Sequence, residues 1–188
     1  MTPKILAFAG STRKDSFNRQ ALEHAVRGAR EAGAEVTLVD LNEYPLPLYN
    51  GDLEGSHGLP GTAVKLKALF KSHHGLLIAC PEYNGSITPL LKNTLDWVSR
   101  PDGEESGLVP YQGKWAALVA ASAGNLGGLR GLRHVREILT NLQVMVIPQQ
   151  MALSQADKAL ADPQSSGLKG LMSTGRALAE ALRHWNSP

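Results

Sequence analysis

The sequence has a single cysteine and no long apolar run among its 188 residues. One cysteine cannot form an internal disulfide, so Cys80 suits a reducing compartment, and we expect a packed thiol rather than a redox centre. The N-terminal MTPKILAFAG is too short to span a membrane and lacks the layout of a secretory signal. We therefore expect a soluble, cytoplasmic protein with no membrane partner.

The sequence also lacks a large excess of charge of either sign. Its 19 Lys and Arg nearly balance its 17 Asp and Glu, which gives a formal net charge of +2. No basic run or aromatic-interleaved basic patch is present, which makes nucleic acid a poor candidate partner. The six histidines are scattered except for His73 and His74, so no ligand spacing predicts a metal site. Length and composition are ordinary for one globular domain, expected over residues 1–188.

Five short apolar runs predict strands: KILAFA (4–9), EVTLVD (35–40), GLLIAC (75–80), WAALVAAS (115–122) and VMVIP (144–148). Four of them are nearly continuous hydrophobics, which is typical of strands buried on both faces of a parallel sheet. Segments with helical spacing alternate with these runs. The pattern favours a doubly wound α/β sheet with helices on both faces, but alternation alone does not fix the strand order.

Five helices are predicted between and after these strands. The first carries Leu22, Ala25 and Val26 on one face and ends where Gly33 supplies a left-handed cap. The other four are expected at 62–73, 89–98, 129–141 and 166–185, with Pro89 in a first helical turn. The Pro/Gly-rich stretch 44–61 and the polar stretch 154–167 are expected to be irregular connections.

The stretch GSTRKDSFNR (10–19), after the first strand, holds more hydrogen-bonding groups than a turn requires. It combines a tight-turn glycine, a guanidinium suited to phosphate and four further polar side chains: Gly10, Arg13, Ser11, Thr12, Ser16 and Asn18. At a helix N-terminus, such groups predict a phosphate site. Neither a P-loop nor a G-x-G-x-x-G motif is present, so NTP hydrolysis and Rossmann-type dinucleotide binding do not fit. Plain helix capping by Ser16 or Asn18 is the alternative.

The stretch PEYNGSITPLLKNTLDW (81–97) follows the third strand. Tyr83 offers a flat apolar face, and the donors of Asn84-Gly85-Ser86 suit the polar edge of a planar heteroaromatic ring. The alternative is an ordinary turn with Asn-Gly in a left-handed corner. No second carboxylate or histidine pairs visibly with Glu82, so we expect it to form a structural ion pair.

The stretch SAGNLGGLRG (122–131) follows the fourth strand and contains Gly124, Gly127 and Gly128. These glycines would let the backbone approach a flat ligand, although a flexible turn before a helix is the alternative. Ligands of open α/β sheets bind outside the carboxyl ends of the strands. A phosphate at the first stretch and a planar ring between the other two describe a mononucleotide, for which FMN is the natural candidate in a five-stranded sheet.

Together GSTRKDSFNR, PEYNGSITPLLKNTLDWVSR and SAGNLGGLR resemble, in order and spacing, the NADPH-dependent FMN reductase family, which includes quinone, chromate and azo-dye reductases. The resemblance implies a flavodoxin-like five-stranded sheet of order 2-1-3-4-5, bound FMN, and NADPH or NADH as hydride donor. It also implies a homodimer, often a dimer of dimers (a homotetramer), with the helix of LKNTLDWVSR at the interface. One departure is Thr88-Pro89, where many members read Pro-Gly; it concerns only the local loop shape.

The resemblance also implies the site residues. Phosphate contacts fall on Ser11, Arg13, Ser16 and Asn18. Isoalloxazine contacts fall on Pro81, Glu82, Tyr83, Asn84, Gly85 and Ser86, joined by Ser122 and Gly124. Arg100 is expected to pair with an acidic residue of a neighbouring subunit, Glu82 being one candidate. No catalytic side chain is expected, because the cofactor carries the chemistry.

The expected function is oxidation of NAD(P)H through bound FMN, with ping-pong transfer of hydride to a small-molecule acceptor such as a quinone. An alternative is a flavodoxin-type electron carrier, which holds FMN without intrinsic NAD(P)H oxidation. Such carriers are strongly acidic for docking to basic redox partners, and a net charge of +2 does not suit that role. A flavin-free interaction protein that kept only the scaffold is a second alternative.

Overall fold

The structure is a computed structural model in which residues 1–185 are described. Five parallel strands form one sheet in the order β2-β1-β3-β4-β5, which confirms the expected flavodoxin-like topology. The strands are β1 (Lys4–Ala9), β2 (Glu35–Val39), β3 (Gly75–Ala79), β4 (Trp115–Ala121) and β5 (Met145–Leu153). β1, β3 and β4 are buried along almost their whole length, which explains their continuous apolar sequences.

β5 is longer than the run expected at 144–148. It continues through the polar pair Gln149-Gln150 to Leu153, and its register against β4 shifts between Ala116 and Leu118. As an edge strand, β5 is only partly buried, so its second half carries no continuous apolar signal. The sequence therefore predicted the start of this strand and missed its end.

The helices in the described residues are α1 (Phe17–Glu31), η1 (Leu41–Glu43, a 3₁₀ turn), α2 (Gly51–His57), α3 (Gly61–Ser72), α4 (Pro89–Val98), α5 (Leu129–Asn141), α6 (Ala156–Ala159) and α7 (Ser166–Trp185). The five expected helices are confirmed, with Gly33 at φ 81° after α1 and Pro89 as the first residue of α4. Two expectations were wrong, because 44–61 contains α2 and 154–167 contains α6. Both helices are short, and α2 buries no residue, so neither has an apolar stripe to reveal it.

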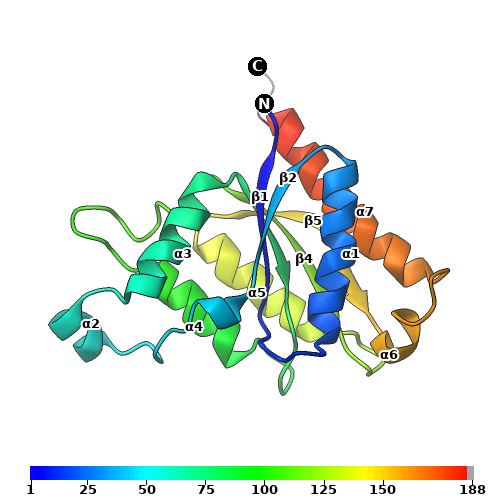
Figure 1. Cartoon of the computed structure of the whole chain (residues 1–188), viewed down its shortest axis with the longest axis horizontal. Coiled ribbons are helices and arrows are strands. Elements are labelled where there is room, and N and C mark those ends of the chain that lie inside the picture. The colour runs from blue at the N-terminus through cyan, green and yellow to red at the C-terminus, as the bar shows by residue number, and fades with distance from the viewer. Residues whose placement is uncertain (186–188) are drawn as a thin grey trace.

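The helices form a layer on each face of the sheet (Figure 1). α1 and α7 cover one face, and α3, α4 and α5 cover the other. Successive residues of β1 point to opposite layers, so Ile5 and Ala7 join the α1/α7 core while Leu6 and Phe8 join the other. Across residues 1–185, no helix combines the length and apolar character needed to cross a bilayer.

The strand order reverses at β1, which has β2 on one side and β3 on the other. Three connections leave the carboxyl edge near this switch point: loop one (residues 10–16), loop two (80–88) and loop three (122–128). Figure 1 shows this edge at the bottom of the molecule, opposite the N-terminus. Such a crevice is where open α/β sheets bind ligands.

Candidate functional site

A cavity of about 240 Å³ lies where the three loops meet. Eight of the twelve residues predicted from the sequence line it: Ser11, Arg13, Ser16, Asn18, Pro81, Glu82, Tyr83 and Ser122. The remaining four, Asn84, Gly85, Ser86 and Gly124, are outside its walls. Phe17, Ala121 and Ala123 complete the lining and were not predicted. The fold thus brings together segments that are more than a hundred residues apart in the chain.

Loop one leaves the start of α1 without a side-chain cap. Ser16 is the N-cap residue, with an extended backbone, yet its hydroxyl makes no capping hydrogen bond. No acidic residue lies in the first turn of α1 either. Plain helix capping is therefore not the use of this hydroxyl, and the positive end of the helix dipole is uncompensated beside the cavity.

Arg13 is an exposed cation at the same place. Its Nη2 donates to the carbonyl of Asp15 at 2.9 Å, and its guanidinium lies 5.6 Å from the centre of the Phe17 ring. In the described part of the chain, Arg13 pairs with no carboxylate. A guanidinium has five N–H donors, so most of them are left for an anion.

Asn18 and Thr88 hold loop one against its neighbours. The buried carboxamide of Asn18 donates to the carbonyl of Ala121 at 2.8 Å and accepts from the N–H of Ala121 at 3.0 Å, which ties α1 to the end of β4. Thr88 Oγ1 donates to the carbonyl of Gly10 at 2.8 Å and accepts from Leu91 N at 3.2 Å, capping α4. The Thr88-Pro89 departure therefore gives a well-capped helix. The sequence predicted a ligand contact for Asn18 but not this link.

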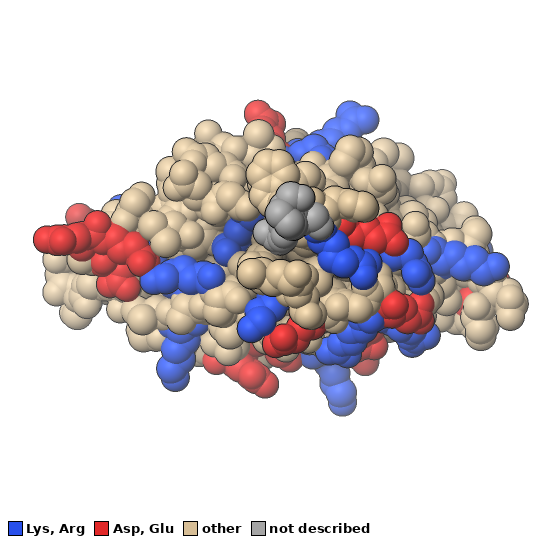
Figure 2. Space-filling model, turned by 90° about the horizontal axis from the view of Figure 1, so that it is seen from above, with Lys and Arg blue, Asp and Glu red and all other residues tan. Residues whose placement is uncertain are grey.

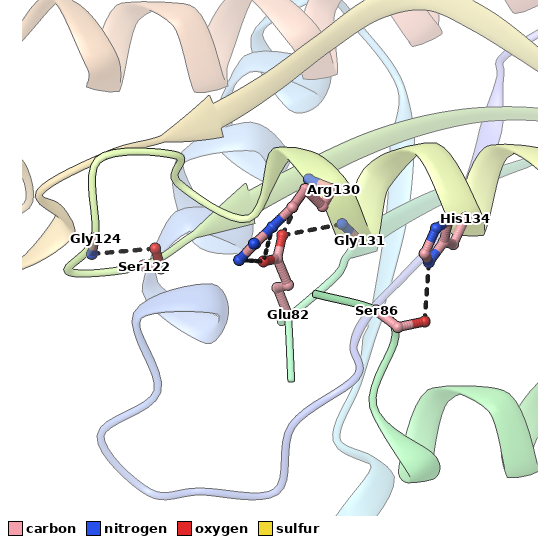
Figure 3. Close-up of polar contacts among 7 residues, drawn as sticks. All are labelled: Glu82, Ser86, Ser122, Gly124, Arg130, Gly131 and His134. Atoms are coloured by element: carbon pink, nitrogen blue, oxygen red, sulfur yellow. Dashed lines mark hydrogen bonds and ion pairs between the residues drawn. The ribbon is translucent and has the colours of Figure 1, made fainter. Parts of the chain in front are cut away.

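Glu82 performs the same task between loop two and α5 (Figure 3). Its Oε2 accepts from the N–H groups of Arg130 and Gly131, both at 3.0 Å, and its Oε1 accepts from Arg130 Nε at 2.7 Å and from Nη2. Burial alone would raise the pKa of Glu82, but the hydrogen bonds from Gly131 and Arg130 lower it. This confirms the expected structural ion pair.

Arg100, the residue expected to reach a neighbouring subunit, has a partner within its own chain. Its Nε lies 2.9 Å from Oε1 of Glu54, and its guanidinium lies over the ring of Tyr49. Glu82 is already paired with Arg130. Both side chains thus have partners within the chain, and a contact of Arg100 with an acidic residue of a neighbouring subunit stays a prediction. Sequence reasoning missed Arg130, whose only signal is its place in the first turn of a predicted helix.

Loop two turns sharply at Asn84-Gly85. Tyr83 and Ser86 exchange two backbone hydrogen bonds at 2.9 and 3.0 Å, and the residues between them have φ of 51° and 80°. This geometry is a type I′ turn, so the left-handed Asn-Gly corner is confirmed. Tyr83 is 56% exposed beside the cavity. Ser86 Oγ instead lies 2.9 Å from His134 Nδ1 on α5 (Figure 3).

The glycines of loop three serve mainly internal packing. A Cβ on Gly127 would lie 2.7 Å from the backbone of Ala152, and one on Gly128 would lie 2.7 Å from the Cβ of Ala120. Packing inside the protein is therefore enough to require glycine at both positions, and the approach of their backbone to a ligand stays a prediction. Gly124 differs, since its nearest neighbour would be Ser122 Oγ at 3.6 Å.

These groups fit a phosphate-bearing planar cofactor such as FMN. Loop one provides the uncapped helix start, two hydroxyls and a free guanidinium, and loop two provides an exposed aromatic face. A cavity of about 240 Å³ encloses only part of a ligand of that size. Within residues 1–185, no three His, Cys, Asp or Glu side chains are placed to hold a metal ion.

Comparison with known proteins agrees with this chemistry. The sequence model of the NADPH-dependent FMN reductase family matches residues 3–158. An NAD(P)H-dependent FMN reductase of Pseudomonas aeruginosa is 36% identical over 157 residues, which is 83% of this chain and 80% of that protein. A 2-hydroxy-1,4-benzoquinone reductase of Burkholderia sp is 34% identical over 162 residues, covering 86% and 84%. The solved structure of FerB, a flavoenzyme NAD(P)H:(acceptor) oxidoreductase from Paracoccus denitrificans, has a TM-score of 0.74 at 25% identity, covering 96% and 98%.

Proposed function

The chain belongs to the NADPH-dependent FMN reductase family, and from that premise we propose that it is an FMN-dependent NAD(P)H oxidoreductase acting on quinone-type acceptors. The observation that carries this proposal is the cavity at the switch point of the sheet. There, Ser16 and most of the donors of Arg13 are unused beside the uncapped start of α1, and the exposed Tyr83 lines the same cavity. Bound FMN would supply the hydride-transfer chemistry.

The chain's own residues would bind and orient the cofactor. Ser11, Arg13 and Ser16 would hold its phosphate, with the first-turn N–H groups of α1 as further donors. Asn18 would then serve mainly to fix α1 against β4, because both ends of its carboxamide are engaged by Ala121. Keeping the loops in place before binding lowers the ordering cost of binding.

The ring would lie along loop two, from Pro81 to Ser86. Tyr83 presents the exposed aromatic face, and the type I′ turn at Asn84-Gly85 presents backbone polar groups. Ser122 and Gly124 would form the opposite wall from loop three, where space remains beside Gly124. No side chain is assigned to proton transfer, so binding and orientation are the roles proposed for this chain.

We further propose that the chain works as one domain in a homodimer or dimer of dimers, with α4 at an interface. Figure 1 shows the segment that contains α2 standing away from the body of the molecule. This helix buries none of its residues, and nearby Leu48 is 79% exposed. Light scattering on the purified protein would give its oligomeric state.

We also propose a cytoplasmic location, which the free buried thiol of Cys80 supports.

The visible absorption spectrum is the first test. We expect the purified protein to take up FMN with bands near ~450 nm that bleach with NADPH or NADH and return with a quinone. Bands that neither donor can bleach would point to an electron carrier instead. Failure to take up flavin at all would overturn the cofactor assignment.

A further inference from the structure

A second cavity, of about 180 Å³, lies beside loop one between the first turns of α1 and the end of β2. Of the three leucines on its floor, Leu38 is 47% exposed, whereas Leu22 and Leu41 are almost fully buried. Ser11 lines both this cavity and the proposed FMN cavity, so the two are neighbours. A volume of about 180 Å³ exceeds the needs of a single ion.

The rim of this cavity holds a carboxylate in a fixed position. Asp40, directly after β2, accepts from Arg19 Nη2 at 2.8 Å through Oδ2. Its Oδ1 accepts from the N–H of Asn42 at 3.0 Å and from Asn42 Nδ2 at 3.1 Å, and the same amide donates to the carbonyl of Thr12 at 3.2 Å. Three of its roughly four acceptor sites are taken. The partly exposed Asp40 side chain retains one for a ligand.

Its position suggests which ligand. A carboxylate oxygen with a free acceptor site suits a ribose hydroxyl, which can donate a hydrogen bond to it. Asp40 offers such a site beside the exposed side chain of Leu38, against which an adenine ring could pack. Loop one is assigned to the FMN phosphate, so an adenosine here would belong to the hydride donor. Resting on the function proposed above, we infer that this cavity receives the adenosine half of the nicotinamide dinucleotide.

Charge at the rim further distinguishes the two donors. Glu23, Asp40 and Glu43 supply three carboxylates, and Arg19 supplies the single guanidinium among the lining residues, already paired with Asp40. The rim therefore keeps an excess of two negative charges. The 2′-phosphate of NADPH would meet like charge there, whereas the free 2′-hydroxyl of NADH would meet acceptors. The cavity should favour NADH over NADPH.

Calorimetry with ADP-ribose and its 2′-phosphorylated form tests the cavity without any redox step. On the FMN-loaded protein, we expect ADP-ribose to bind about tenfold more tightly than the phosphorylated form. Leu38→Trp fills the floor and should weaken ADP-ribose binding about tenfold. Glu23→Gln with Glu43→Gln should narrow the difference between the two ligands. Val64→Trp is the control, because Val64 is similarly exposed at 42% but lies on α3 outside both cavities.

Stopped-flow reduction separates failure of this inference from failure of the proposed function. Reduced nicotinamide mononucleotide lacks the adenosine half, so Leu38→Trp should leave its half-saturating concentration unchanged and raise that of NADH about tenfold. If NADH reduces FMN in the wild type but Leu38→Trp changes neither NADH saturation nor ADP-ribose affinity, the adenosine assignment is wrong. If neither donor reduces FMN, the proposed function fails, and the assignment of this cavity to a hydride donor fails with it.

Discussion

At the amino end of the sheet, Lys114 is almost fully buried, and its ammonium donates to the carbonyl of His73, the C-cap residue that follows α3. At the carboxyl end, Arg13 is exposed and pairs with no carboxylate in the described chain, beside the uncapped start of α1. A cation at a helix C-terminus stabilises the helix, whereas one near an N-terminus does not. The first arrangement serves the fold, and the second is favourable only with an anion present.

Other polar groups near the amino end follow the first pattern. Lys67 donates to the carbonyl of Arg100 just beyond α4, and the imidazole of His73 contacts both Leu69 O, at 2.7 Å, and Thr37 Oγ1, at 2.8 Å. Figure 2 views the molecule from this end and shows basic side chains interspersed with acidic ones. No single-signed field is visible on this face.

The same contrast recurs within the site. Asn18, Glu82 and Thr88 are polar residues whose hydrogen bonds go to the protein, and they fix the loops. Arg13 and Ser16 keep donors unused by the protein. We therefore expect the first group to control the stability of the loops and the second to control cofactor affinity.

The largest effect should come from Arg13→Ala combined with Ser16→Ala. Losing one charge-assisted and one neutral hydrogen bond to the phosphate should cost about 3 kcal/mol, weakening FMN binding about a hundredfold. Quenching of FMN fluorescence on titration would measure the dissociation constant. Without FMN, the free energy of unfolding should stay the same or rise slightly, since Arg13 opposes the dipole of α1.

Arg27→Ala is the matched control for that double variant. Arg27 is an exposed cation on the same helix, outside the cavity, so its loss changes the net charge without removing a proposed contact. A double variant that keeps wild-type FMN affinity would show that the phosphate is not held by loop one.

The sequence predicted the fold well wherever burial is uniform. β1, β3 and β4 are covered on both faces and therefore read as continuous apolar runs, and the longer helices carry an apolar stripe. The second half of β5 and the short helix α2 were missed because an edge strand and an unburied helix need neither pattern.

The site was predictable as a set of polar loops but not as a network. Residue types at strand ends identified loop one, since serines, an arginine and a helix start are all visible locally. The partners of Asn18 and Glu82 are 103 and 48 residues away in the chain, so no local pattern could reveal them. For the same reason, the packing of Gly127 against Ala152 and of Gly128 against Ala120 could not be predicted from the sequence.

Glu82→Gln should have the second largest effect, a decrease in the free energy of unfolding. The variant weakens several hydrogen bonds at the start of α5 and removes the ion pair with Arg130, so we expect a loss of about 2 kcal/mol at pH 7, measured by urea unfolding. Because the folded pKa of Glu82 is lowered, the carboxylate's contribution is complete above the unfolded pKa of about 4.3 and disappears as pH falls further. The difference between variant and wild type should therefore shrink below about pH 4.

Glu137→Gln provides the control for that comparison, because Glu137 is an exposed carboxylate on α5, the helix whose start Glu82 contacts. It should change stability by less than about 0.5 kcal/mol. If Glu82→Gln behaved like this control, the link between loop two and α5 would contribute nothing to the fold, and the division of the site into structural and ligand-binding groups would lose its main support.

The smallest effect is expected from Lys114→Met at the amino end. Removing a buried cation should raise the free energy of unfolding, whereas leaving the carbonyl of His73 without this donor should lower it. Because the two contributions oppose, the free energy of unfolding at pH 7 should change by no more than about 1 kcal/mol. Burial lowers the pKa of Lys114 to about 8. Between pH 8 and the unfolded pKa of about 10.4, this lysine binds more protons in the unfolded chain than in the folded one. The free energy of unfolding of the wild type should therefore rise with pH over this range.

Lys114→Met should abolish that rise, whereas Lys65→Met, at an exposed position of α3, should retain it. Urea unfolding between about pH 7 and 10 measures both. FMN affinity should match the wild type in both variants, because neither residue lines the proposed FMN cavity. A large loss of FMN affinity in Lys114→Met would contradict this separation of the two ends of the sheet. It would mean that Lys114, at the amino end, also affects the conformation of the FMN-binding loops at the carboxyl end.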